Sequence, residues 1–261
     1  MRTFRSESSG TAESLTFVGH STVLLEVGGA RILTDPLLRD RILHIRRVAE
    51  PPESEATREI DCVLLSHLHP DHLDPPSLRT LGQEVRIVAP AGSARILRRR
   101  GFGNIEEVAP GDSAMVGSAR VEGFAVEHEG RRLPIGREVQ ALGYEVRGAA
   151  NVLFLGDTAP FDMSALPGAD VALLPIAGWG PNLRTEHHLS PRTAAEAAAA
   201  LQVQTVVPIH WGTMLRAGLE GRKAELLDRP AEEFAAEMAK IAPDVALRVL
   251  APGESMALVR S

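Results

Sequence analysis

Residues 66–74 form the segment Ser-His-Leu-His-Pro-Asp-His-Leu-Asp, in which three of the chain's nine histidines and two carboxylates are interleaved. A short apolar run precedes it and predicts a strand that ends where the histidines begin. In an extended stretch His67 and His69 lie on the same side, and the proline that follows redirects the chain so that Asp71 and His72 face a neighbouring point. Imidazole and carboxylate groups at this spacing are ligands for zinc or a similar divalent ion. A polar surface loop, with histidines that only cap a turn, is the alternative.

One loop does not complete a two-metal site, so further ligands have to come from other segments. Asp157 follows the apolar run in LFLGDT, His210 follows the run in VVPIHWGT, and His128 follows residues 121–126. Alone, each of these residues is explained equally well by an ordinary turn or a half-exposed surface position. Because all three come just after strand-like runs, as His67 does, one sheet edge is expected to gather them.

The elements that must position these side chains are mainly strands. Glycine and proline interrupt apolar runs of strand length throughout the chain. We expect strands at 15–18, 23–27, 31–34, 62–66, 85–89, 113–116, 119–126, 140–146, 151–155, 171–174, 206–208, 246–250 and 256–259. We expect helices at 94–100 after an N-cap at Ser93, at 192–201 after Ser190-Pro191, and at 231–241.

Two other stretches have a different composition. The charged, proline-containing segment 39–58 predicts a surface loop with one helical turn. The polar residues 1–13 predict a flexible tail, and 14–261 are expected to form one domain.

Composition excludes several classes of protein. The chain has 261 residues, of which 44% are hydrophobic and 24% charged, so we expect an ordinary globular protein rather than a disordered one. Its 28 basic and 34 acidic side chains give a net charge of −6, which argues against a general affinity for nucleic acid. The single cysteine, Cys62, excludes an internal disulfide. The apolar runs are too short for a membrane helix and no signal-peptide core is present, so we expect a cytoplasmic protein without stable membrane insertion.

Several segments together resemble the metallo-β-lactamase-fold hydrolases. They are GHSTVLLEVGGARILTDP at 19–36, SHLHPDHLD at 66–74, LFLGDT at 153–158, HHLSP at 187–191 and IHWGT at 209–213. The resemblance runs from about Leu15 to Val259. It is greatest to the branch that includes L-ascorbate-6-phosphate lactonase and N-acyl-phosphatidylethanolamine phospholipase D. It implies an α+β fold, a four-layer αββα sandwich, with a binuclear metal site at one edge of the sheets.

The resemblance also implies a set of metal ligands. The first metal would be held by His67, His69 and His128, the second by Asp71, His72 and His210, and both by Asp157. His128 departs from the pattern of the phospholipase relatives, because Glu129 follows it where they carry an aromatic residue.

Other residues match positions around such a site. His188 matches a histidine that faces the substrate in the phospholipase branch, and Arg131 and Arg132 are expected to help bind an anionic substrate. Asp35 matches a buried carboxylate that we expect to accept the second ring N–H of a metal-bound histidine. His20 is expected near the pocket, either behind the ligands or as a purely structural residue.

These expectations lead to a functional hypothesis. A hydroxide bridging two divalent ions, zinc first and manganese or iron next, cleaves a phosphodiester or a lactone or ester of a small soluble substrate. Asp71 relays a proton to the leaving oxygen, and His188 binds a substrate phosphate or the oxyanion.

Three alternatives stay open. A metal-binding or sensor protein of the same fold would have these ligands without catalysis. A di-iron redox protein commonly carries an acidic residue where this chain has His69. An RNA-processing nuclease normally adds a further domain and a basic surface. The sequence leaves a homo-oligomer possible.

Overall fold

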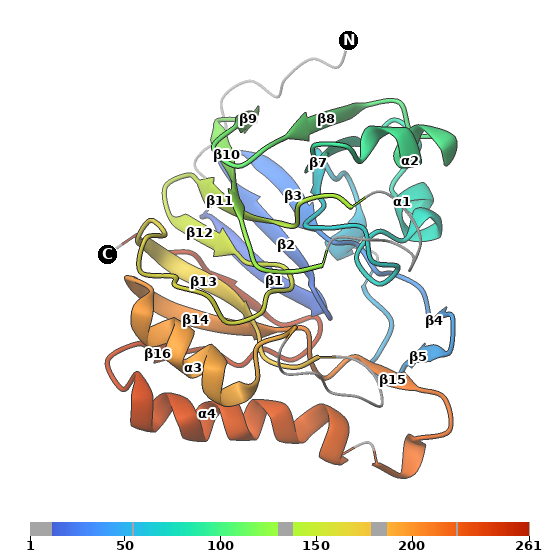
Figure 1. Ribbon diagram of the computed structural model, residues 1–261. Coiled ribbons are helices and arrows are strands. Elements are labelled where there is room, and N and C mark those ends of the chain that lie inside the picture. The colour runs from blue at the N-terminus through green and yellow to red at the C-terminus, as the bar shows by residue number, and fades with distance from the viewer. Residues whose placement is uncertain (1–11, 54, 130–137, 179–186, 223, 261) are drawn as a thin grey trace.

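Two large β-sheets pack face to face and carry helices on both outer sides (Figure 1). The computed structural model describes residues 12–53, 55–129, 138–178, 187–222 and 224–260. Of the predicted tail 1–13, residues 1–11 lie outside this described part. The four layers form the αββα sandwich that the sequence predicted.

The first sheet has seven strands in the order β17-β1-β2-β3-β6-β7-β8. Strands β3, β6, β7 and β8 pair in parallel, and β1 runs in the same direction because β2 pairs antiparallel to both β1 and β3. The carboxyl ends of these strands therefore lie at one edge. The strands are β1 (Ser14–Gly19), β2 (Thr22–Val27), β3 (Ala30–Thr34), β6 (Cys62–Leu64), β7 (Arg86–Pro90), β8 (Ile105–Val108) and β17 (Ser255–Ala257).

The second sheet also has seven strands, in the order β16-β14-β13-β12-β11-β10-β9. Strands β12, β13, β14 and β16 are parallel, whereas β9, β10, β11 and β12 pair antiparallel, so β10 and β12 run in the same direction. The strands are β9 (Ser113–Val116), β10 (Ala119–Ala125), β11 (Leu142–Arg147), β12 (Asn151–Phe154), β13 (Ala169–Pro175), β14 (Val203–Ile209) and β16 (Ala246–Leu247).

Shorter elements complete the fold. The α-helices are α1 (Pro75–Thr80), α2 (Ala94–Arg99), α3 (Pro191–Ala200) and α4 (Arg229–Ile241). A small third sheet contains β4 (Arg41–Ile42), β5 (Ile45–Arg47) and β15 (Met214–Arg216). Two 3-10 turns, η1 (Glu55–Thr57) and η2 (Glu220–Arg222), and the π-helical turn η3 (Ala224–Asp228) lie in the connections. Within the described part of the chain, no helix is long and apolar enough to span a bilayer.

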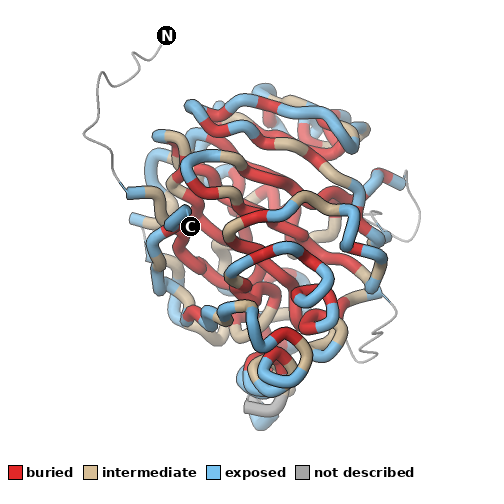
Figure 2. The backbone as a smooth tube through the Cα atoms, turned by 90° about the vertical axis from the view of Figure 1, so that its left-hand side faces the viewer, coloured by how far each residue is buried: buried red, intermediate tan, exposed pale blue. Residues whose placement is uncertain are grey.

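Alternation along the strands produces the layers. On β12, Val152 and Phe154 point into the core between the sheets, whereas Leu153 packs outward with the α3 and α4 side chains Ala198 and Phe234. A separate cluster packs α1 and α2 on the outside of the first sheet. Buried positions accordingly run along the strands of both sheets in Figure 2, and exposed positions lie mainly in loops and on the outer sides of helices.

The structure confirms the three predicted helices and corrects three details. Segment 39–58 contains the strands β4 and β5 in addition to its helical turn η1. Helix α1 was not predicted, although Pro75 and Pro76 lie in its first turn, a position to which proline is well suited. Ser93 makes no side-chain cap for α2; the Glu107 carboxylate accepts the N–H groups of Gly92 and Ala94 instead, at 2.7 and 2.8 Å.

A buried tyrosine ties the two sheets together directly behind the histidine-rich loop. The Tyr144 hydroxyl, on β11, donates to the Leu65 carbonyl at 2.8 Å. The Leu65 N–H donates to the Val88 carbonyl, so in a parallel ladder the Leu65 carbonyl would accept from residue 90, which is a proline without an N–H. The tyrosine therefore supplies a donor that the neighbouring strand lacks.

We expect Tyr144→Phe to lower the free energy of unfolding by about 1–3 kcal/mol, because the Leu65 carbonyl stays buried without a donor. Urea denaturation of the purified protein measures this change. Ser118→Ala is the matched control, since it removes an exposed hydroxyl that donates to the Gly28 carbonyl at 3.0 Å and should change stability by less than about 0.5 kcal/mol. Equal stabilities of Tyr144→Phe and wild type would contradict this account.

Candidate metal centre

The candidate ligands come from loops at the same edge of both sheets. In the first sheet, His20 follows β1, and the histidine-rich loop beginning at Ser66 follows β6. In the second sheet, His128, Asp157 and His210 follow β10, β12 and β14. Because these strands run in one direction within each sheet, their carboxyl ends meet at one edge, as the sequence predicted.

One group consists of three imidazoles. His67 Nε2 lies 2.9 Å from His69 Nδ1, which in turn lies 3.2 Å from His128 Nε2. Burial lowers the pKa of all three, that of His67 well below its usual value and that of His128 to about 4. The three rings are therefore neutral near pH 7, and a neutral imidazole is the form that binds a metal.

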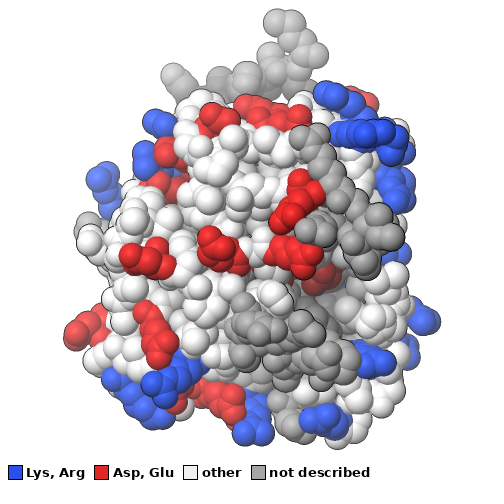
Figure 3. Space-filling model, in the orientation of Figure 1, with Lys and Arg blue, Asp and Glu red and all other residues white. Residues whose placement is uncertain are grey.

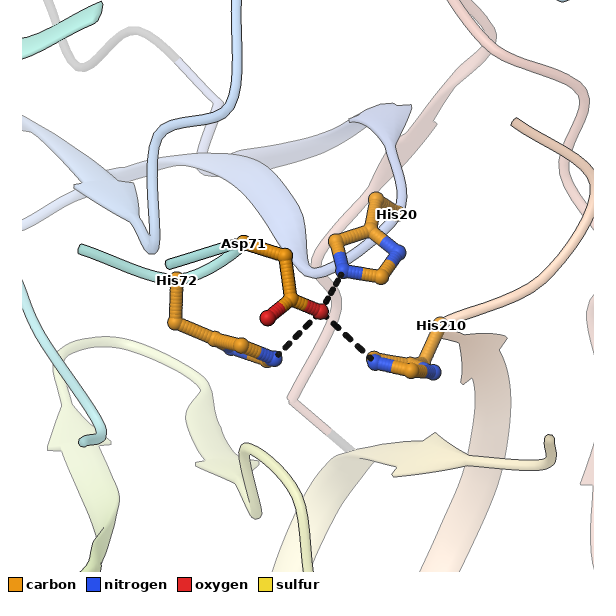
Figure 4. Close-up of side chains that lie close together, drawn as sticks. All are labelled: His20, Asp71, His72 and His210. Atoms are coloured by element: carbon orange, nitrogen blue, oxygen red, sulfur yellow. Dashed lines mark hydrogen bonds and ion pairs between the residues drawn. The ribbon is translucent and has the colours of Figure 1, made fainter. Parts of the chain in front are cut away.

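A second group surrounds the Asp71 carboxylate (Figure 4). Asp71 Oδ2 lies 3.0 Å from His20 Nε2, 3.6 Å from His72 Nε2 and 3.7 Å from His210 Nε2. One ligand atom from each of these four residues lies within 4.8 Å of every other. Three imidazoles therefore converge on a single carboxylate oxygen.

Asp157 lies between the two groups. Its Oδ2 is 3.2 Å from both His72 Nε2 and His210 Nε2, and 4.0 Å from His128 Nε2. His188 Nδ1 lies 3.5 Å from the same oxygen, Asp157 Oδ2. Asp157 is thus within reach of imidazoles from both groups.

The charges of these groups depend on one another. Burial alone would raise the pKa values of Asp71 and Asp157, but the surrounding histidines lower both well below the usual range. Burial likewise opposes protonation of His72 and His210, yet the carboxylates raise the pKa of His72 well above its usual value and that of His210 to about 9. The buried Asp157 and the partly exposed Asp71 therefore both stay ionised and attract positive charge to this point.

Bound cations explain the arrangement of these donor atoms better than hydrogen bonds among the donors themselves do. His72 Nε2, His188 Nδ1 and Asp157 Oδ1 are buried and have no hydrogen-bond partner among the described residues. Buried polar atoms are normally satisfied, so such a cluster requires an explanation. Divalent ions bound by these nitrogens and oxygens would provide one. The sulfur of the buried Cys62 belongs to none of the donor groups.

Asp35 supports the loop from behind. Its carboxylate accepts from the Ser66 N–H at 2.7 Å and the Ser66 hydroxyl at 2.5 Å, and lies 2.7 Å from His72 Nδ1. Its backbone φ of +30° is in a region that non-glycine residues rarely adopt. Asp35 thus lies where the sequence placed it, against the ring of a candidate ligand. Sequence reasoning missed Ser66, although it directly precedes the first histidine of the motif.

Gly156 lets the two sheets approach at this edge. Its φ is +58°, and a Cβ on it would lie 2.5 Å from Ser66 Cβ and 2.8 Å from Ser66 Oγ. Any side chain here would therefore push the Asp157 strand away from the histidine-rich loop.

Of the other residues noted in the sequence, two lie beside the candidate ligands, two lie outside the described residues and one lies away from the site. The side chain of His188 is 18% exposed beside Asp157, and His20 is buried in direct contact with Asp71. Arg131 and Arg132 lie outside the described residues. Asp74, the second carboxylate of the motif, caps α1 and pairs with Arg39 at 2.7 Å rather than joining the site.

Two further supports could not be inferred from the motifs. His210 Nδ1 lies 2.7 Å from the Ala177 carbonyl, and the Thr213 hydroxyl accepts the His20 N–H at 2.8 Å. The only signal for Thr213 was its place three residues after His210, and a backbone carbonyl such as that of Ala177 leaves no signal in a sequence.

Comparisons with known proteins agree with this fold. The chain is 30% identical over 255 residues to a UPF0173 metal-dependent hydrolase of Rubrobacter xylanophilus, covering 93% of this chain and 95% of that protein. It is 28% identical over 237 residues to N-acyl-phosphatidylethanolamine-hydrolyzing phospholipase D 1 of Caenorhabditis elegans, covering 80% of this chain and 66% of that one.

Among solved structures, the di-iron β-hydroxylase CmlA of Streptomyces venezuelae has a similar fold. Its TM-score is 0.70 at 20% identity, with 97% of this chain and 55% of that chain covered. The family model described as "Beta-lactamase superfamily domain" matches residues 30–211, which include the candidate residues from Asp35 to His210. With that match and a relative at 30% identity over almost its whole length, the chain belongs to the β-lactamase superfamily domain family.

Proposed function

We propose that this protein is a metal-dependent hydrolase that binds two divalent cations and cleaves a phosphodiester or a lactone or ester bond. The observation that carries the proposal is the position of Asp157 Oδ2, 3.2 Å from two imidazoles of the second group and 4.0 Å from one of the first. A carboxylate so placed is suited to contact two cations at once.

The ligands follow from the two groups. His67, His69 and His128 hold one cation, and Asp71, His72 and His210 hold the other, with Asp157 shared. The donors are all nitrogen and oxygen, so zinc is the first expectation and manganese or iron the next. When bound, such cations act as Lewis acids on a substrate oxygen and lower the pKa of water toward neutrality.

The chain's own residues orient the reaction. The Asp71 side chain is 19% exposed, and its Oδ2 contacts His20. Its ionised carboxylate would take up the proton that the attacking water loses and pass it, through the other oxygen, to the leaving group. His188 lies half-buried beside Asp157 and donates to a substrate phosphate or oxyanion. Arg131 and Arg132 retain their proposed role in binding an anionic substrate.

The substrate we favour is small and soluble. On the face in Figure 3, Asp and Glu lie across the middle while Lys and Arg lie mainly toward the periphery, so its described part presents no continuous basic surface for a polyanion. The relative named for hydrolysing a phospholipid supports the phosphodiester class. A di-iron redox protein remains the competing function, since the di-iron β-hydroxylase CmlA has a similar fold. We favour the hydrolase because di-iron redox relatives are expected to carry an acidic residue where this chain has His69.

Metal content tests the ligand assignment. Protein purified without chelator should hold about two equivalents of divalent metal per chain. His67→Ala should lose the cation of the first group, and Asp157→Ala should weaken both, as measured by elemental analysis after dialysis. His44→Ala, on the exposed β4–β5 turn, is the control and should keep the wild-type content. Full metal content in His67→Ala or Asp157→Ala would refute the assignment.

A substrate panel tests the reaction. We expect turnover of a bis-aryl phosphodiester or a lactone, with zinc, manganese or iron added, and a loss of about 10²–10⁴-fold in Asp71→Asn because the proton donor is removed. A phosphomonoester serves as the comparison substrate. Metal-loaded protein that turns over none of these compounds would favour a binding or sensor protein.

A further inference from the structure

His20 has a backbone conformation that is uncommon for a residue other than glycine. Its φ is +57°, in the left-handed region that only a few per cent of non-glycine residues adopt, and it is only 1% exposed. Such strain persists only where the surroundings impose it, and it concentrates at functional sites. The contacts of His20 with Asp71 and His210 lead to the candidate metal centre.

The side chain holds one candidate ligand. His20 Nε2 lies 3.0 Å from Asp71 Oδ2, the oxygen on which His72 and His210 also converge (Figure 4). Because Asp71 lies 51 positions away on another loop, this contact fixes the carboxylate from outside its own segment. With Nε2–H donated to Oδ2, the carboxylate is restrained from rotating about its side-chain bonds.

The backbone of the same residue holds a second ligand. The His20 carbonyl accepts the His210 N–H at 2.8 Å, and the His20 N–H donates to the Thr213 hydroxyl at 2.8 Å. His210 is itself left-handed, with φ +62°, and the two ring centroids are 4.1 Å apart. His20 thus connects the loop after β1, in the first sheet, to the loop after β14, in the second.

We propose that His20 is a positioning residue for the second cation: it sets Asp71 through its side chain and His210 through its backbone. The inference rests on the proposed two-cation function. It gives His20 a specific partner and a specific site, whereas a purely structural histidine would affect both sites equally through the fold.

Zinc affinity of each site provides the test, measured by competition with a chromophoric chelator. His20→Asn removes the imidazole donor while keeping a residue that tolerates the left-handed backbone. We expect one of the two zinc affinities, that of the site that Asp71→Asn also weakens, to fall about 10–100-fold, the usual effect of losing a support behind a ligand, with the other unchanged. In an Asp71→Asn background the same substitution should add less than about twofold, because its side-chain partner is already altered.

His44→Asn is the matched histidine control, because His44 is exposed on the β4–β5 turn. The visible spectrum of the cobalt-substituted protein gives a second readout, and in His20→Asn it should change only for the cobalt at the site whose spectrum Asp71→Asn also alters. Melting with excess chelator checks the fold, and His20→Asn should melt within a few degrees of wild type.

The outcomes separate the two proposals. Wild-type protein that binds fewer than two zinc ions would overturn the proposed function before His20 is considered. Two zinc ions in wild type with unchanged affinities in His20→Asn would overturn the positioning role alone. Equal losses at both sites, or a much lower melting temperature with chelator, would also overturn it, because His20 would then act on the fold.

Discussion

A neutral imidazole has a single N–H, and the group that accepts it decides which nitrogen faces the site. In four of the candidate ligands the protein engages Nδ1 and leaves Nε2 toward the centre. The partners are the Ser66 hydroxyl for His67, the Asp35 carboxylate for His72, the His187 carbonyl for His128 and the Ala177 carbonyl for His210. This shared arrangement determines where ligand atoms can meet, and it requires support from both sheets.

The second dependence is electrostatic. Asp157 is buried and Asp71 is only 19% exposed, yet both carboxylates stay ionised, and a largely desolvated anion needs positive charge nearby. In the absence of a cation His72 and His210 supply that charge as protons, whereas the rings of the first group stay neutral. The two halves of the centre therefore differ in charge although both are rich in histidine.

Local sequence patterns were sufficient for the framework of this fold. Ligands that directly follow an apolar run, such as His67 and Asp157, could be placed at a sheet edge, because strand ends are visible in a sequence. Asp74, the other carboxylate of the motif, caps helix α1, which was not predicted. Position on a loop does not reveal which of its carboxylates turns inward.

Long-range pairs could not be predicted from local patterns, and the contact of Asp35 with a candidate ligand was expected only through the family resemblance. The contact of His20 with Asp71 joins residues 51 positions apart, and the Tyr144 hydroxyl reaches Leu65 across 79 positions. The contact of the Glu107 carboxylate with the N–H groups at the start of α2, where a cap by Ser93 was expected, is of the same kind. Such partners depend on how the two sheets dock, which no local period encodes.

The close approach of the two sheets at Gly156 bears on how they can separate when the protein unfolds. Because a Cβ there would lie 2.5 Å from Ser66 Cβ, the two sheets touch through backbone and the smallest side chains at the edge where the candidate ligands meet. Four of those seven ligands follow a strand of the first sheet and three follow strands of the second, so cations bound between them would join the two sheets. Opening the edge would then require breaking coordination bonds, and the rate of unfolding would be set by the release of metal rather than by the hydrophobic core.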